Sequence, residues 1–527
     1  MAKIKAADGS AAPSLMRYAP AFVLLAIAIA DAARVADTDL WGHIAFGRLF
    51  LQVGPVSHDP YNYSAPGHLW TEHEWLSEVL MALAYNACGA VGLKLLKLLC
   101  SAITVVMIAA AEAETGAPIP IQFAVLMVSA FALAPQMQFR PQLFTFAFLA
   151  TLIALLARDN YRRPARLWLV VPMFGLWANL HGGFFVGIVA MGVYSGVVTA
   201  VDLASGYSLR RGMRLIAITI AGATATLLTP YGTGVWSTVI SELRNPLTRK
   251  VIADWRPLVA VISGQLHDPH SGIAFTLAVV GIIAVLVASV AASPRDGDWA
   301  LVAVAAVMAI AAFVAVRNMA LAVIAAAAPV ARHLALVARS KRARTSTDWN
   351  RGALTDQQGQ RRFFIGGQIL VVLLAIVLAA ESGLFSDEIP AAANYPVGAA
   401  AFMRTHELRG NVLTTFEWGQ YMIWKTSPGS KVFIDARFDL AYPMSIVKEY
   451  IDFINGVPRG ARLIDRYPHD YVLMPAGSVA YETMIARKDW RLIYHDGVAA
   501  LFARADSPAA HLPGVPVNAT ALPSDFP

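Results

Sequence analysis

Long apolar runs alternate with short polar segments over the first 380 residues of the chain. Because a helix needs about 20 mostly apolar residues to cross a bilayer, each run predicts a transmembrane helix. The predicted spans lie near 18–36, 91–111, 120–134, 141–157, 166–180, 184–201, 213–229, 272–291, 299–316, 318–337 and 363–380. These runs, about eleven in number, predict a polytopic α-helical membrane protein.

The polar segments between the spans differ in their content of basic residues. Segments 158–166, 209–214 and 332–362 are rich in arginine or lysine, whereas loop 37–75 holds a single basic residue, Arg48. Cytoplasmic loops carry an excess of lysine and arginine. The bias predicts a cytoplasmic N-terminus and places loop 37–75, loop 230–271 and all residues after 380 on the extracytoplasmic face.

The first apolar run follows the basic residues Lys3, Lys5 and Arg17 and ends in small residues, a pattern that also fits a cleaved signal peptide. We interpret this run as a retained membrane anchor, because the later spans already commit the chain to the membrane. Residues 1–380 then form one transmembrane domain that includes both extracytoplasmic loops.

The pattern changes after residue 380. Strand-like runs at 411–416, 431–438, 471–475 and 491–504 alternate with helix-like stretches at 396–408 and 444–454. Strands that alternate with helices are typical of an α/β domain. Residues 381–527 therefore predict a small extracytoplasmic α/β domain, which ends in a tail rich in proline and alanine.

The composition agrees with this division and excludes other classes. The chain is 57% hydrophobic and 15% charged, whereas soluble domains carry about 25% charged residues. The net charge of +7 arises from basic residues in short loops between spans, so it does not indicate a nucleic-acid partner. Cys88 and Cys100 lie in or beside an apolar run, which argues against a disulfide framework.

Loop 37–75 concentrates polar side chains that can carry chemistry. Its acids and histidines are Asp37, Asp39, His43, His58, Asp59, His68, Glu72, His73 and Glu74. The tryptophans and tyrosines between them fit an aromatic belt at the membrane surface. Carboxylates at headgroup depth are costly unless they are paired, coordinated or used. We therefore interpret the Asp37–Asp39 pair as functional, whereas Glu72-His73-Glu74 fits a site and a solvated turn equally well.

Two chemistries are open to the Asp37–Asp39 pair. One carboxylate can act as a general base on an acceptor hydroxyl. Alternatively, Asp37, Asp39 and His43 can hold a divalent cation that neutralises a phosphate leaving group. The following segment, 68–85, predicts an amphipathic helix that lies along the outer interface before the next span.

The order of these elements resembles the type C glycosyltransferases, membrane enzymes that use polyprenyl-phosphate-linked sugars. The resemblance rests on the segments "DTDLWGHIAFGRLF", "HDPYNYSAPGHLWTEHEWLSEVL", "FRPQLFTFAFL", "WANLHGGFFVG" and "VFIDARFDL". These segments resemble a bacterial branch of that superfamily whose members are mostly unassigned. The resemblance implies an enzyme of the inner membrane. It also implies that Asp37 or Asp39 is the catalytic base or a metal ligand.

The resemblance further implies that basic residues near the outer ends of later spans bind the donor phosphate. The candidates are Arg140, Arg317, Arg244, Arg249, Lys250 and Arg256. An arginine near a span end also fits snorkelling to the interface, although its planar guanidinium suits a phosphate. His181, in a glycine-rich turn, fits a structural hydrogen bond as well as a site role.

In the C-terminal domain, the alternation of Asp435, Arg437 and Asp439 predicts that all three lie on one face of a strand. The structural interpretation is an ion pair within the domain. The functional interpretation is that these residues recognise an acceptor at the membrane surface.

These observations favour a glycosyltransferase that moves a sugar from a polyprenyl phosphate to a lipid, glycan or protein acceptor, with inversion at the anomeric carbon. A divalent metal is compatible with this chemistry and is not required by it. A lipid or glycan transporter and a non-catalytic scaffold are the alternatives. Convergence of Asp37, Asp39 and the arginines on one outward cavity would favour the enzyme.

Overall fold

The computed structural model describes residues 35–162, 165–245, 252–266, 272–293, 298–345 and 395–512, together with isolated positions between 22 and 30 and between 373 and 389. Most of the predicted spans 18–36 and 363–380, and the proline- and alanine-rich tail beyond 512, lie outside the described residues.

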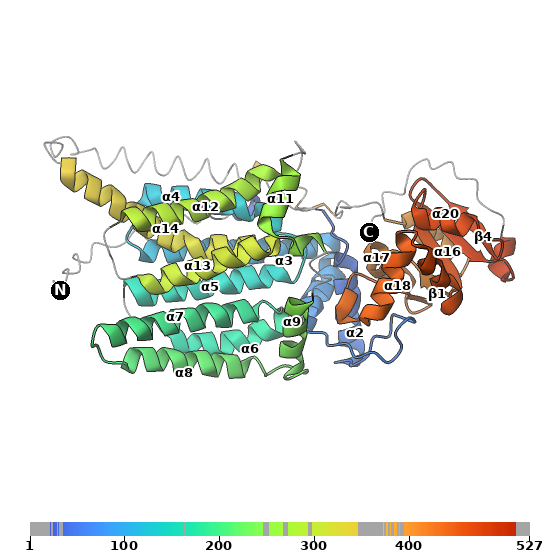
Figure 1. Ribbon diagram of the computed structural model, residues 1–527, viewed down its shortest axis with the longest axis horizontal. Helices are drawn as coiled ribbons and strands as arrows, with labels where there is room; N and C mark the ends of the chain where they lie inside the picture. The colour runs from blue at the N-terminus through green and yellow to red at the C-terminus, as the bar shows by residue number, and fades with distance from the viewer. Residues whose placement is uncertain are drawn as a thin grey trace.

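The transmembrane part is a bundle of helices that run side by side (Figure 1). Its helices are α3 (Trp75–Glu114), α4 (Ile119–Leu133), α5 (Gln142–Tyr161), α6 (Val170–Leu180), α7 (Phe184–Ala204), α8 (Arg210–Ala225), α12 (Ile273–Ala292), α13 (Trp299–Val314) and α14 (Met319–Thr345). Six helices of the described part are long and apolar enough to cross a membrane. The prediction of a polytopic α-helical membrane protein is confirmed, whereas the number of about eleven spans stays a prediction.

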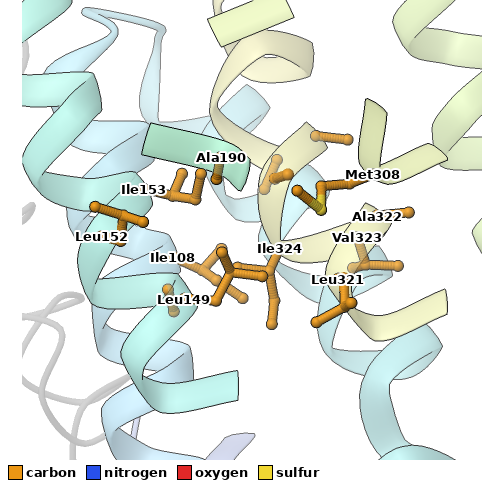
Figure 2. Packing of buried hydrophobic residues seen from close by; sticks show 14 of the residues in the cluster. Ile108, Leu149, Leu152, Ile153, Ala190, Met308, Leu321, Ala322, Val323 and Ile324 are labelled. Atoms are coloured by element: carbon orange, nitrogen blue, oxygen red, sulfur yellow. The ribbon is translucent and has the colours of Figure 1, made fainter. Parts of the chain in front are cut away.

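The bundle core is built from close-packed aliphatic side chains (Figure 2). Ile108 of α3 and Leu149 of α5 lie opposite Ile324 of α14, and all three are buried. Lipid tails are as apolar as these side chains, so helix association depends on tight packing and on small residues that allow close approach. The buried run of alanines at 325–328 in α14 provides such an approach.

Helix α2 (Leu40–Val53) connects the bundle to the C-terminal domain and packs on the first part of α3. A β-carbon on Gly47 would overlap the backbone carbonyl of Glu78. Helix α3 has non-helical dihedrals at Cys88 and Gly89, where φ of Gly89 is 56°. Residues 75–87 therefore form a separate helix before the long span. The helix predicted for segment 68–85 is present, but it begins at Trp75, because residues 68–74 are not helical. Its position at the membrane interface stays a prediction.

The C-terminal domain contains a five-stranded sheet, so the prediction of an α/β domain is confirmed. The strands are β1 (Gly410–Leu413), β2 (Ser430–Val432), β3 (Tyr471–Pro475), β4 (Trp490–His495) and β5 (Ala499–Arg504), in the order β2-β1-β3-β5-β4. β1 is parallel to β2 and β3, and β5 is antiparallel to β3 and β4. The main helices are α16 (Val397–Thr405), α17 (Phe416–Thr426), α18 (Met444–Ile454) and α20 (Val479–Ile485).

Two strand predictions need correction. The run 491–504 is a hairpin of β4 and β5, because the chain turns at Asp496, whose carboxylate accepts hydrogen bonds from the backbone N–H groups of Val498 and Ala499. The run 431–438 ends as a strand at Val432. Asp435 accepts a hydrogen bond from the backbone N–H of Arg437 at 2.9 Å, which starts a turn instead of extending the strand. The prediction that Asp435, Arg437 and Asp439 share a strand face is therefore wrong.

Loop 37–75 packs onto the C-terminal domain as an extension of its sheet. Asn62 forms a parallel bridge with Val432, and the Val432 N–H donates to the Tyr61 carbonyl at 2.9 Å. Buried Arg437 pairs with Asp59 of the loop and with Asp435, both at 2.6 Å. The loop and the domain consequently share one hydrophobic core.

The close contact of α2 with α3 predicts the effect of one added methyl group. Gly47→Ala places that methyl group against the Glu78 carbonyl and should destabilise the fold by about 1–3 kcal/mol. The measurement is the apparent melting temperature in detergent. Gly192→Ala in α7 is the matched control, because open space surrounds Gly192. An unchanged melting temperature for Gly47→Ala would contradict this packing.

The contact between loop and domain predicts a dependence of stability on pH. The His469 ring donates from Nε2 to the Leu463 carbonyl at 3.0 Å and accepts at Nδ1 from the Tyr63 hydroxyl at 2.6 Å, so it is neutral. Burial lowers the pKa of His469 to about 4. The unfolded chain takes up a proton below about pH 6.5 while the folded chain does not, so stability falls as pH drops from about 6.5 to about 4.

By pH 5 the loss attributable to His469 should reach about 2 kcal/mol. Thermal unfolding of wild type and His469→Gln at pH 7 and pH 5 measures it. The variant should lose less stability than wild type over this interval; equal losses would show that His469 does not contribute.

Candidate functional site

The two aspartates stand at the N-terminus of α2, where the chain leaves the bundle. Asp39 occupies the N-cap position, but its side chain makes no capping hydrogen bond. Its backbone N–H donates to Oδ1 of Asp37 at 2.7 Å, and the Tyr395 hydroxyl donates to the Asp37 carbonyl at 2.8 Å. These two bonds fix the backbone at Asp37 and Asp39 and leave the Asp39 carboxylate unused as a helix cap.

Arg140 brings together acids from three parts of the chain. It lies between α4 and α5, and its guanidinium pairs with Asp37, with Asp39 at 3.2 Å and with Asp254 at 2.8 Å. Asp254 belongs to a short 3₁₀ helix, η4 (Ala253–Trp255), of loop 230–271. We refer to Asp37, Asp39, Arg140 and Asp254 as the aspartate–arginine cluster. One guanidinium pairs with three carboxyl groups, so the cluster has more acidic groups than basic ones.

Asp37 and Asp39 differ in their electrostatic surroundings and in their hydrogen bonds. Burial, followed by the neighbouring Asp37, raises the pKa of Asp39 to about 6, although Arg140 opposes the shift. Oδ1 of Asp39 is buried and receives no hydrogen bond from the described residues. Both oxygens of Asp37 are engaged, Oδ1 by the Asp39 N–H and Oδ2 by Arg140. Asp39 therefore offers a lone pair that is free to accept a proton.

Arg140 also lines an apolar hollow between α3 and α5. As the side chains stand, the enclosed space is about the size of one water molecule. Its walls are Met81, Leu93, Leu96, Lys97, Cys100, Phe139, Arg140, Leu143 and Phe144. Lys97 is 2% exposed, and its ammonium lies 4.3 Å from the Phe139 ring centroid. Two cations thus stand beside an apolar surface.

Lys97 is not among the site residues predicted above, although its position in the sequence indicates a possible role. Lys94 and Lys97 are charged residues inside the predicted span 91–111, and charges within a span usually mark a site or a pathway. The two lysines differ in their contacts: Lys94 donates to the carbonyl and hydroxyl oxygens of Ser386, both at 2.8 Å, whereas Lys97 faces the hollow.

A second group of ionisable residues lies about one helical turn further along α2. We call it the histidine–glutamate cluster; it contains His43, Glu72, His73, Glu74, Glu78 and His181. Nδ1 of His43 lies 2.8 Å from Oε1 of Glu78. Oε1 of Glu74 lies 3.3 Å from Nε2 of His181 and 3.7 Å from Nε2 of His73. The segment Glu72-His73-Glu74 is therefore not a solvated turn, because Glu72 and His73 are buried.

The hydrogen bonds of His181 define its tautomer. Its Nδ1 accepts from the backbone N–H of Gly183 at 2.8 Å, so the proton is on Nε2, which lies 3.3 Å from Oε1 of Glu74. Burial lowers the pKa of His181 to about 4, which keeps the ring neutral. A histidine fixed in this way orients the carboxylate that it contacts. His181 therefore has both a structural hydrogen bond within the glycine-rich turn and a contact with Glu74 of the cluster.

Two acids of this second cluster, Glu72 and Glu78, are poorly neutralised. Burial, and then the neighbouring Glu78, raise the pKa of Glu72 well above its usual value. Within the described ranges, no lysine or arginine forms an ion pair with Glu72, Glu74 or Glu78. Oε2 of Glu72 and Oε2 of Glu78 are buried and receive no hydrogen bond from the residues described.

The sequence prediction placed a metal at Asp37, Asp39 and His43, and the structure separates these residues. The aspartates face the Arg140 guanidinium, whereas His43 faces Glu78. Among the described residues, the ligand atoms that converge belong to His43, Glu74 and Glu78 and lie within 4.8 Å of one another. The two aspartates do not fit a shared ion with His43 in this arrangement.

The remaining candidates occupy other positions. Arg317 pairs with Glu242 at 2.9 Å and stacks on Trp255 at 4.5 Å, next to Asp254. The exposed residues are Arg244, Arg256 and His58, and the partly exposed one is His68. Arg249 and Lys250 lie outside the described residues.

Buried Arg437 stacks on Phe46 and Trp70 and also pairs with Asp59 and Asp435. Arg437 and Asp59 therefore connect the loop to the domain.

Comparison with solved structures identifies the fold. The chain is similar to the archaeal oligosaccharyltransferase AglB from Archaeoglobus fulgidus in complex with an inhibitory peptide and a dolichol-phosphate, with a TM-score of 0.52, 11% identity and coverage of 88% of this chain and 70% of that chain. The same enzyme tethered to an acceptor peptide gives a TM-score of 0.52, 11% identity and coverage of 88% and 69%. The fold expected from the resemblance to the type C glycosyltransferases is confirmed.

A further similar structure is ArnT from Cupriavidus metallidurans bound to undecaprenyl phosphate, with a TM-score of 0.48, 11% identity and coverage of 94% of this chain and 98% of that chain. No protein-family model and no curated protein sequence matches the chain.

Proposed function

We propose that the protein is a glycosyltransferase that moves a sugar from a polyprenyl-phosphate-linked donor to an acceptor on the extracytoplasmic face of the inner membrane. The observation that carries the proposal is the aspartate–arginine cluster: a paired arginine and a carboxylate with a free oxygen stand at an apolar hollow at the end of the bundle. The structurally similar AglB is an oligosaccharyltransferase that was captured with a dolichol-phosphate and a peptide, which supports this reaction class.

In this proposal Asp39 is the general base. A general base must be ionised near neutral pH and able to take a proton, and a pKa of about 6 meets both requirements. Its unbonded Oδ1 accepts the proton of the acceptor hydroxyl as the new glycosidic bond forms. Asp37 acts as a positioning residue, because it holds the Asp39 backbone and Arg140. Attack opposite the leaving phosphate inverts the anomeric carbon.

Arg140 and Lys97 bind the departing polyprenyl phosphate in this proposal. Neighbouring carboxylates raise the pKa of Arg140 although burial opposes the shift, so the guanidinium stays charged. A guanidinium suits bidentate bonds to phosphate oxygens, and an ammonium adds a point charge. The apolar side chains that line the hollow would contact the first isoprene units of the lipid once they move apart, because the hollow is too small for them as it stands. Arg140 must release some of its aspartate contacts when a phosphate binds.

The arrangement also bears on the alternatives. A transporter needs ionisable groups along a path through the bilayer. Here both clusters include residues at the start of α2, and Figure 1 shows α2 between the helix bundle and the C-terminal domain, at one end of the bundle. A scaffold without activity would have no use for a buried carboxylate oxygen that lacks a hydrogen bond, since such an oxygen is costly to bury.

Removal of the base tests the reaction. Asp39→Asn should lower the transfer rate about 100- to 10,000-fold, because the amide cannot accept the proton. Mass spectrometry of membrane glycolipids and envelope glycans compares cells that lack the protein, cells with wild type and cells with the variant. The glycosylated product should appear only with wild type.

Asp254→Asn is the matched control for Asp39→Asn, because it removes another acid from Arg140 without removing the base. It should retain most of the transfer. A folded, membrane-inserted Asp39→Asn protein that transfers sugar at the wild-type rate would exclude Asp39 as the base.

Removal of the buried ammonium tests the donor site. Lys97→Met should weaken binding of undecaprenyl phosphate about 10- to 100-fold, because a charged hydrogen bond of about 1.5–3 kcal/mol is lost. Titration of the purified protein with this lipid, followed by native mass spectrometry, measures the effect. Lys94→Met is the control, because Lys94 contacts Ser386 and does not line the hollow. Equal affinities for Lys97→Met and wild type would exclude Lys97 from the donor site.

A further inference from the structure

The histidine–glutamate cluster has the geometry of a metal centre that the proposed transfer reaction does not use. The aspartate–arginine cluster already contains the groups needed for proton transfer and phosphate binding. His43, Glu74 and Glu78 instead contact one another where α2 packs against α3, and Glu74 also lies next to His181 of the α6–α7 turn. The three side chains therefore need a separate explanation.

The three ligand atoms come from rigid elements in a pattern that suits one ion. Glu74 and Glu78 are four residues apart at the start of α3, so they lie on the same face of the helix. His43 approaches from α2. The ligand atoms lie within 4.8 Å of one another, and atoms bound to one zinc ion at about 2.0–2.2 Å can be at most about 4.4 Å apart. A small inward movement of the side chains brings all three to one ion.

The burial of unbonded oxygens is a second, independent observation. The Glu78 side chain is 2% exposed, and its Oε2 receives no hydrogen bond from the described residues. The nearby Glu72 is 6% exposed and has an unbonded Oε2 as well. Oε1 of Glu78 contacts His43, and the Glu72 and Glu78 carboxyl groups interact with each other. Two buried carboxylates that interact are strongly disfavoured unless they share a proton or bind a cation.

The surroundings also match those of metal ligands. Nε2 of His181 lies 3.3 Å from Oε1 of Glu74, and its Nδ1 accepts from the Gly183 N–H. The ligands of metals are usually oriented by polar partners outside the coordination sphere. The side chains of His43 and Glu74 are 12% and 17% exposed, which leaves a route for an ion from solvent.

We propose that His43, Glu74 and Glu78 bind a divalent transition-metal ion, with His181 as the residue that positions Glu74. One imidazole nitrogen and two carboxylates favour Zn²⁺ over Mg²⁺ or Ca²⁺, because the latter two prefer oxygen ligands only. The ion ties the N-terminal part of α2 to the start of α3 and, through His181, to the turn before α7. Asp39 stands one helical turn before His43, so the ion holds the helix that carries the proposed base.

The test measures metal content and does not depend on glycosyl transfer. The full-length protein in detergent is stripped with a chelator, titrated with Zn²⁺ and analysed by elemental mass spectrometry; Co²⁺ serves as a spectroscopic probe of the ligands. Wild type should retain one equivalent of Zn²⁺ and show the absorption of a Co²⁺ site with nitrogen and oxygen ligands. His43→Ala and Glu78→Gln should lose the tight site.

Two further variants separate a metal site from a general loss of structure. His58→Ala removes an exposed histidine of the same loop and should keep the full equivalent of Zn²⁺. His181→Gln should weaken Zn²⁺ binding about 10- to 100-fold without abolishing it. Monodisperse elution of each variant checks its fold.

The outcomes decide between an ion and a proton as the occupant of the cluster. Stripped wild type that takes up no Zn²⁺ would overturn the proposal and indicate that Glu72 and Glu78 share a proton. Full binding by His43→Ala would overturn it as well. Since neither result involves sugar transfer, a failure here leaves the proposed function standing, and a failure of Asp39→Asn leaves the metal site standing.

Discussion

The ion pairs of Arg140 hold together the part of the molecule that carries the proposed active site. This one guanidinium contacts carboxylates from the start of α2 and from loop 230–271, segments more than 200 residues apart in the sequence. Three acids in a partly buried place would repel one another without it. Burial, and then the neighbouring Asp37, raise the pKa of Asp39 to about 6, which suits the proton transfer proposed for it. Charge pairing and the proposed chemistry thus have the same origin.

The C-terminal domain contributes to this end by fixing the loop that precedes α3. Loop 37–75 extends the sheet at β2 and is held by the buried Arg437, whose guanidinium is sandwiched with Phe46 and Trp70 and paired with two acids. A paired and stacked arginine tolerates burial well, because both its charge and its planar faces are satisfied. The domain and the loop therefore act as one body above the bundle, and Tyr395 extends the contact to Asp37.

The histidine–glutamate cluster shows how two sites share one helix. Asp39 and His43 are four residues apart on α2, yet Asp39 faces Arg140 and His43 faces Glu78. The basic side chain of the first cluster is an arginine, whereas the basic side chains of the second cluster are all histidines. This difference in chemistry matches a proposed role in phosphate and proton handling for one cluster and in metal binding for the other.

The sequence by itself determined the class of the protein, because apolar run length and charge bias follow directly from the energetics of the bilayer. It also selected Asp37, Asp39 and Arg140, since charges at the ends of spans are costly without a use. It did not show that His43 turns away from the aspartates, that Lys97 faces a hollow, or that Arg437 leaves the strand. Those outcomes depend on which neighbour each side chain meets, and only tertiary packing brings loop 230–271, α3 and the C-terminal domain to the start of α2.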